Sequence, residues 1–119
     1  MEAIDLAAKL ALIDDHWNPR VVAELNGQQV RLAKIEGEFV WHSHEQEDEL
    51  FMVLEGELRM EFRDRVILLR KGEILVVPAG VEHRPVAERE VHLLLFEPAA
   101  TINTGNVVDE RTRGALSRI

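Results

Sequence analysis

From Val21 onward the sequence consists of short apolar runs separated by glycines, and this pattern restricts the fold more than any other feature. Turns are expected at Gly27, Gly56 and Gly72, with strand-length segments between them. Many short strands joined by glycine turns are typical of an all-β sandwich or barrel. Because no linker, repeat or low-complexity tract interrupts the 119 residues, we expect one domain over residues 1–119, with the barrel at about 21–98.

The turn signals also predict where the strands lie. Asn26-Gly27 is a strong hairpin signal, and Glu55-Gly56 predicts a second turn. The strands are expected at residues 21–25, 28–35, 49–54, 57–62, 66–69, 74–77 and 91–96. Residues 3–13 are rich in Ala and Leu at helical spacing, which predicts a short N-terminal helix that packs on the barrel or on a partner subunit. The tail from Ala100 is expected to be irregular.

Charge and composition argue against several classes of partner. The formal net charge is −8 and the basic residues are scattered, whereas nucleic acids and anionic membranes need clustered Lys and Arg. No apolar run reaches the roughly 18 residues of a membrane span. The acidic start lacks the basic region of a signal peptide, and there is no cysteine. We therefore expect a cytoplasmic protein that binds neither nucleic acid nor membranes.

One group of residues has the composition of a metal site. Alternate side chains of a strand share a face, so His42 and His44 are expected side by side inside the barrel. Glu49 follows after a four-residue loop, and His83 comes just after Pro78-Ala79-Gly80. Three imidazoles and one carboxylate suit one divalent transition metal ion, with Fe, Mn, Ni, Zn and Cu left open. Taken alone, His-x-His is equally well explained by two histidines on a half-buried strand.

The spacing of these residues resembles the two motifs of the cupin family. The first motif runs Gly, His-x-His, Glu, Gly, and the chain supplies Gly37, His42, His44, Glu49 and Gly56. The second runs Gly, Pro-x-Gly, His, and the chain supplies Gly72, Pro78, Gly80 and His83 with the family's spacing. Two departures leave the ligands intact: Gly37 stands one residue closer to His42 than usual, and Ala87 replaces a frequent Asn.

The resemblance covers about residues 30–98 and implies a jelly-roll barrel, a double-stranded β-helix, that holds the metal with His42, His44, Glu49 and His83. The tail after Glu97 is similar to that of small cupins described as mannose-6-phosphate-isomerase-like, most of which lack an assigned reaction. Cupins of this kind commonly form homodimers. Outward apolar residues fit that expectation; we assign Leu50, Met52, Leu54, Leu75 and Val77 to outer faces.

Four further residues are candidates for the pocket wall near the metal. Strand parity places Val40 and Phe51 on the inner face, and Met60 is expected to join them. His92 has apolar neighbours on both sides, so parity does not decide whether it faces the pocket or is simply buried. His16 and Trp17 are expected to be packing or surface residues. No general acid or base other than Glu49 is evident.

These features predict a small metalloenzyme that acts on a small oxygenated molecule as an isomerase, lyase or dioxygenase. Two alternatives stay open: a non-catalytic binding or sensor module, and a barrel that uses the metal only for stability. Sugar-phosphate isomerisation is disfavoured, because the inward positions offer no cluster of Lys or Arg for a phosphate.

Overall fold

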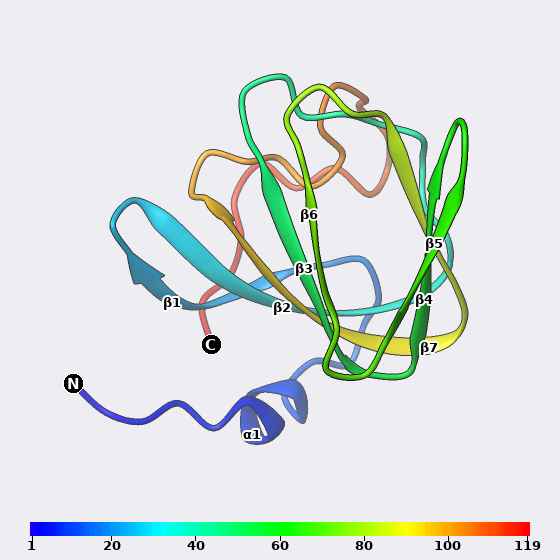
Figure 1. Ribbon diagram of the computed structural model, residues 1–119. Coiled ribbons are helices and arrows are strands. Elements are labelled where there is room, and N and C mark those ends of the chain that lie inside the picture. Colours follow the sequence, from blue (N-terminus) through cyan, green and yellow to red (C-terminus); the bar gives the residue numbers. More distant parts are fainter.

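The computed structural model describes residues 1–119, and its strands follow the apolar runs of the sequence (Figure 1). One short helix, α1 (Leu6–Leu10), precedes the strands. The strands are β1 (Arg20–Leu25), β2 (Gln28–Glu38), β3 (Glu49–Glu55), β4 (Glu57–Phe62), β5 (Val66–Arg70), β6 (Ile74–Val77) and β7 (His83–Pro98). The prediction of an all-β jelly-roll barrel with a short N-terminal helix is confirmed.

The longest strand, β7, holds the barrel together because it pairs with three other strands. Its residues 83–86 pair antiparallel with β4, and its residues 92–96 lie between β2 and β3. The main path of the sheet is therefore β1-β2-β7-β3-β6, with β5 joined to β4. Sequence reasoning predicted only residues 91–96 of this strand. Its first half contains Pro85 and the charged run 88–90, which do not favour a strand on their own.

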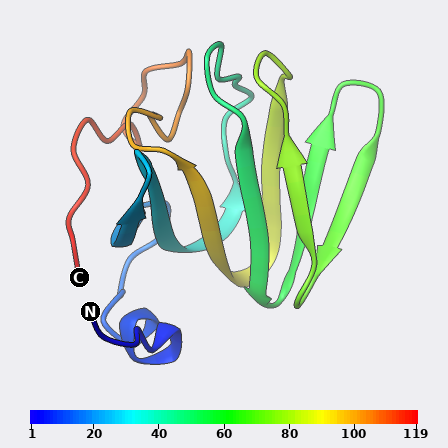
Figure 2. The ribbon, with the colours of Figure 1, turned by 60° about the vertical axis from the view of Figure 1, so that its left-hand side comes forward.

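The interior of the barrel is filled by side chains that alternate along the strands. Twelve buried residues from six strands form one cluster, which consists of Ala33, Ile35, Phe51, Val53, Leu58, Met60, Leu69, Val77, Ala87, Val91, Leu93 and Leu95. The predicted alternation of β4 is confirmed, since Leu58 and Met60 are fully buried. The longer loops gather at one end of the barrel (Figure 2).

The helix packs outside the barrel and is shorter than the predicted 3–13. It begins after Asp5, whose side chain accepts a hydrogen bond from the Ala8 amide at 3.1 Å. Asp14 and Asp15 follow it, and acidic residues are unfavourable at a helix C-terminus. Leu10 packs with Ile13 and Leu32 in a small cluster on the outer face. No helix has the length and apolar character that a membrane crossing requires.

The side chains that β6 directs outward differ from those predicted. Val77 pairs directly with Glu49, and paired residues share a face, so Val77 points inward and is buried. Leu75 packs against the same inner cluster. The exposed apolar side chains of this face are Val66, Leu68, Ile74 and Val76, from β5 and β6.

The glycine turns can be tested by comparing two substitutions. Gly27 and Gly56 both have a positive φ, of 76° and 91°, where an alanine is strained. A Cβ at Gly27 would meet no atom within 4 Å, whereas one at Gly56 would lie 3.0 Å from the Glu90 carbonyl oxygen. We expect Gly27→Ala to lower the free energy of unfolding by about 1 kcal/mol and Gly56→Ala by about 2 kcal/mol or more. Urea unfolding measures both, and equal losses would contradict the contact at Gly56.

Candidate metal centre

Four buried side chains converge near the end of the barrel where residues 39–48, residues 78–82 and the tail meet (Figure 2). His42 and His44 lie between β2 and β3, Glu49 begins β3, and His83 begins β7. One donor atom of each residue lies within 4.8 Å of the others. All four side chains are at most 4% exposed. The structure thus brings together the four residues that the sequence singled out.

The backbone of the site is held by hydrogen bonds between its own segments. Residues 39–48 do not form the expected strand; only His42 makes a bridge, in which it exchanges amide hydrogen bonds of 3.0 and 2.9 Å with His83. The Gly80 amide donates to the His44 carbonyl at 2.8 Å. The Ala79 amide donates to the Asp48 carboxylate at 2.8 Å. These bonds tie the two ligand-bearing loops to each other.

The hydrogen bonds of two imidazoles fix which ring nitrogen is free. His42 Nδ1 lies 2.9 Å from the Val40 carbonyl oxygen, and His83 Nδ1 lies 2.9 Å from that of Val81. A carbonyl can only accept, so each Nδ1 carries the proton. The Nε2 atom of each ring is left with its lone pair, which is the arrangement seen in metal-ligating histidines.

The remaining donor atoms have no hydrogen-bond partner in the protein. Glu49 Oε1, His83 Nε2 and both ring nitrogens of His44 are buried and unpaired. The Nε2 atoms of His44 and His83 lie 3.2 and 3.4 Å from Glu49 Oε1. Each buried polar atom left unsatisfied costs about 1–3 kcal/mol. One cation between these atoms would satisfy them together, so the donor set fits a divalent transition metal ion.

The protonation states of the site are those that a metal requires. Burial, together with the nearby His83 ring, lowers the pKa of His42 to about 4. Burial raises the pKa of Glu49, but the close contacts of its carboxylate with the side chains of Glu97, His44 and His83 outweigh that effect and hold the pKa well below its usual range. At neutral pH, His42 is therefore neutral and Glu49 is ionised, and no proton must be removed from either before a metal binds.

A second buried carboxyl group, Glu97, lies beside Glu49. Its Oε1 accepts a hydrogen bond of 2.6 Å from Arg31 Nη1, while its Oε2 is buried without a partner. Burial and the adjacent Glu49 carboxylate raise the pKa of Glu97 well above its usual range, and Arg31 offsets only part of that rise. Glu97 is therefore a titratable group of the pocket in addition to Glu49, the one general acid or base that the sequence made evident.

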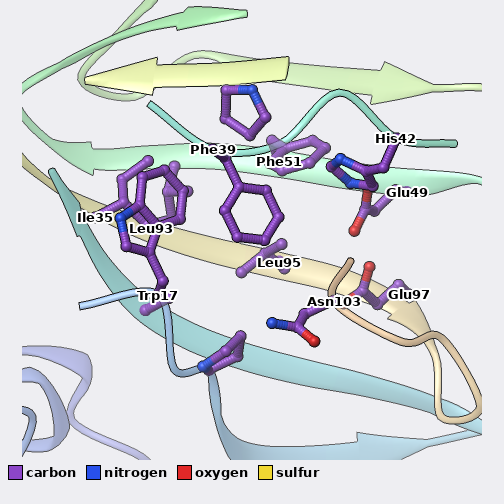
Figure 3. A pocket seen from close by; sticks show the side chains of 13 residues that line it. Trp17, Ile35, Phe39, His42, Glu49, Phe51, Leu93, Leu95, Glu97 and Asn103 are labelled. Atoms are coloured by element: carbon purple, nitrogen blue, oxygen red, sulfur yellow. The ribbon is translucent and has the colours of Figure 1, made fainter. Parts of the chain in front are cut away.

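A cavity of about 50 Å³ extends from the metal site into the barrel (Figure 3). His42, Glu49, Glu97 and Asn103 form its polar end. The rest of the wall is apolar and consists of Trp17, Pro19, Ala33, Ile35, Phe39, Phe51, Pro85, Leu93 and Leu95. Trp17 stacks on Phe39 with ring centroids 4.6 Å apart. The site thus combines donor atoms with a mostly apolar pocket.

The four candidates for the pocket wall differ in where they lie. Phe51 lines the cavity. Met60 is fully buried in the core, and the Val40 carbonyl bonds the His42 ring, but neither residue lines the cavity. His92 lies on the outer face, where its side chain is 25% exposed and its Nε2 is 3.0 Å from Glu90 Oε1. Because inner-face residues alternate along β7, its neighbours Val91 and Leu93 occupy the interior instead.

Sequence reasoning did not assign Glu97, Trp17, Phe39 or Asn103 to this cavity. Glu97 could have been found, because it continues the inward alternation of Val91, Leu93 and Leu95 along β7. Trp17 and Asn103 lie outside the strands, and only tertiary contacts bring them to the wall.

The irregular tail closes over the loop that bears His42 and His44. The Asn106 amide donates to the Ser43 carbonyl at 3.0 Å, and the Asn106 side chain accepts from the Ser43 amide at 2.9 Å. Gly105 packs so closely that a Cβ on it would overlap the Ser43 carbonyl oxygen and lie 3.1 Å from His42 Cδ2. The tail therefore buttresses the metal-binding loop from outside.

The protein is a β-barrel with three histidines and one glutamate gathered at one end. Comparisons with known proteins identify the family to which a barrel of this kind belongs. The model of the cupin domain family matches residues 26–97. The chain therefore belongs to the cupin family.

Solved structures of relatives agree with this assignment. A cupin-2 domain containing protein from Shewanella frigidimarina is 49% identical, with a TM-score of 0.79 over 80% of this chain and 93% of that one. Protein NMB1881 from Neisseria meningitidis is 35% identical, with a TM-score of 0.75 over 82% of this chain and 100% of that one. Two hydroquinone 1,2-dioxygenases, at 22% and 21% identity with TM-scores of 0.70 and 0.64, share the fold alone.

A curated relative, the uncharacterised protein YdbB of Bacillus subtilis, is 45% identical over 64 residues. The match covers 53% of this chain and 57% of that protein, so the chain spans little more than half the length of this relative.

The depressed pKa of His42 predicts a loss of stability in acid for metal-free protein. The unfolded chain binds a proton at His42 near pH 6.5 and the native protein only near pH 4, so stability falls as the pH falls between these values. The contribution is about 3 kcal/mol. Urea unfolding with EDTA should show a smaller loss between pH 7 and 4.5 for His42→Gln than for wild type. His92→Gln, which changes an outer-face histidine, should keep the wild-type loss; an unchanged slope in His42→Gln would contradict the prediction.

The contact of Gly105 with Ser43 predicts that Gly105→Ala lowers the free energy of unfolding by about 1–3 kcal/mol, because backbone would have to move. Gly114 provides a matched control, since a Cβ there meets nothing within 4 Å, and Gly114→Ala should change stability by less than about 0.5 kcal/mol. Thermal unfolding compares the two. Faster amide exchange at Ser43 in Gly105→Ala, but not in Gly114→Ala, would show that the metal-binding loop is destabilised. Equal effects of the two substitutions would contradict a stabilising contact between the tail and this loop.

Proposed function

We propose that the protein is a metal-dependent enzyme that acts on a small oxygenated molecule, as an isomerase, lyase or dioxygenase. His42, His44, Glu49 and His83 would hold one ion of Fe, Mn, Ni, Zn or Cu. The observation that carries the proposal is the convergence of buried, unpaired donor atoms at the polar end of a cavity. Because His42 and Glu49 line that cavity, a molecule bound there would lie next to the ion.

When bound, such an ion supplies a Lewis acid or a site for O₂. The protein's own residues would do the rest. The backbone carbonyls of Val40 and Val81 orient the imidazoles of His42 and His83. Apolar walls such as Phe51 and Leu95 limit the water in the cavity, which strengthens electrostatic interactions at its polar end.

The dioxygenase option gains support from the hydroquinone 1,2-dioxygenases that share the fold, since they indicate chemistry that such a barrel accommodates. Sugar-phosphate isomerisation is less well supported. Among the residues that line the cavity there is no Lys or Arg, and the nearby Arg31 is already paired with Glu97.

The second candidate function is a non-catalytic binding or sensor module, in which the metal orients a bound molecule. The small size of the cavity favours it, because about 50 Å³ holds only a few water-sized atoms.

We also propose that the protein acts as a cytoplasmic homodimer. The exposed apolar side chains of β5 and β6, with Ile74 60% and Val76 51% exposed, support a second copy as the partner of this face.

Elemental analysis of protein purified without added metal tests the proposed site. We expect about one equivalent of a divalent transition metal in wild type, and loss of that metal in His42→Ala and His83→Ala, because each substitution removes a buried ligand. His92→Ala is the matched control and should keep the metal. Folded wild-type protein that refuses Fe, Mn, Ni, Zn and Cu would contradict the proposal.

Turnover of hydroxy acids, sugars and catechols, with and without O₂, then separates the two candidate functions. A metal-dependent product supports the enzyme. Saturable binding with no product in any reaction favours the binding module.

A further inference from the structure

Building on the proposed metal-dependent function, we propose that Glu97 recognises the ligand of this cavity. The ligand class is an uncharged molecule of about five non-hydrogen atoms. One of its oxygens would face the ion, and a neighbouring hydroxyl group would hydrogen-bond Glu97.

Glu97 has an unused hydrogen-bonding atom at the right place. The residue is only 2% exposed, yet it lines the cavity beside Glu49 (Figure 3). One carboxyl oxygen is bound by Arg31, and the other, Oε2, has no partner in the protein. A buried oxygen of this kind needs a hydrogen-bonding group, and a ligand hydroxyl in the cavity would supply one.

Arg31 holds Glu97 in place, and Glu97 is the carboxyl group with which it pairs. Its guanidinium donates to Glu97 Oε1 at 2.6 Å, to the Thr101 and Ala99 carbonyls at 2.9 and 3.0 Å, and to the Gln29 side chain at 3.0 Å. Because Arg31 is buried and makes these four hydrogen bonds, the carboxyl group of Glu97 is fixed before any ligand arrives.

The other polar side chains of the cavity wall are already engaged. Asn103 donates to the Arg111 carbonyl at 2.7 Å and accepts from the Arg113 amide at 2.9 Å. The indole of Trp17 donates to the Glu36 carbonyl at 2.9 Å. Since His42 and Glu49 belong to the metal site, Glu97 is the remaining polar group that a ligand can meet.

Size and charge define the ligand class. A cavity of about 50 Å³ has room for about three to five water-sized atoms. Phe39, Phe51 and Leu95 offer apolar contacts to the carbon atoms of the ligand. An anionic group away from the ion would be buried without a counter-charge, which is strongly unfavourable. A short hydroxyketone or diol meets these conditions.

The test compares hydroxyacetone with butanone on zinc-loaded wild-type protein. Both probes have three carbons and a carbonyl oxygen in common, and they differ only by a hydroxyl in place of a methyl group. We expect hydroxyacetone to bind about tenfold more tightly, as measured by ligand-observed NMR titration. Equal affinities, or no binding of hydroxyacetone, would overturn the inference.

Two variants assign that preference to Glu97. Glu97→Gln keeps the shape of the side chain but replaces one carboxyl oxygen with an NH₂ group, and it should reduce the preference severalfold. The double variant Arg31→Met/Glu97→Met removes the pair without leaving a buried unpaired charge, and it should bind both probes equally. Glu90→Gln, on the outer face, should keep the full preference. A preference that survives in the double variant would overturn the role of Glu97.

Zinc content, measured on every sample, keeps this test apart from that of the proposed function. Wild-type protein that holds no zinc contradicts the metal site itself, and with it the inference. Variants that hold zinc weakly but keep the preference would show that Glu97 only positions Glu49. Should a variant fail to fold, a crystal structure of zinc-loaded wild type with hydroxyacetone decides: the hydroxyl oxygen is expected within about 3.2 Å of Glu97 Oε2, and any other placement rejects the inference.

Discussion

The unpaired donor atoms at the end of the barrel are the constraint on which the rest of the structure depends. Dehydrating Glu49 Oε1, both ring nitrogens of His44 and His83 Nε2 without partners is unfavourable by several kcal/mol in total. The neighbouring backbone shows the opposite pattern, because the amides of His42, Gly80 and His83 all find carbonyl partners. The segments of the site are thus fixed through their backbone while the side-chain atoms stay free for a cation.

The carboxyl group of Glu97 is likewise fixed at one oxygen and free at the other. Arg31 occupies one oxygen of Glu97, and the β2–β7 pairing sets the distance between them, since Arg31 lies opposite Leu95 in the ladder. The long strand β7 therefore supplies His83 at its start and Glu97 near its end. One strand that crosses the barrel brings a metal ligand and a group for ligand recognition to the same cavity.

Much of this architecture follows from local rules in the sequence. Turn residues and alternation located the strands, and motif spacing singled out His42, His44, Glu49 and His83. Alternation also contains the signal for Glu97, which lies one residue beyond the predicted strand 91–96. Other features depend on tertiary contacts. Residues 39–48 bond to a strand only through Phe39 and His42, which meet the start of β7, and His44, Asp48 and Ser43 bond to another loop and to the tail. Trp17 adopts a positive φ of 58°, which no sequence pattern here would indicate.

The cavity and the buried pair of Glu49 and Glu97 do not stabilise the fold. Their presence helps to decide whether the metal has a structural or a functional role. A cavity of about 50 Å³ in a packed interior costs about 1 kcal/mol, at about 24 cal/mol per Å³. The buried pair of Glu49 and Glu97 adds electrostatic repulsion that Arg31 offsets only in part. A metal that served only to stabilise the barrel would need neither feature. Their combination beside the donor atoms is accounted for by a molecule that enters the cavity, which supports a ligand-binding or catalytic role over a structural one.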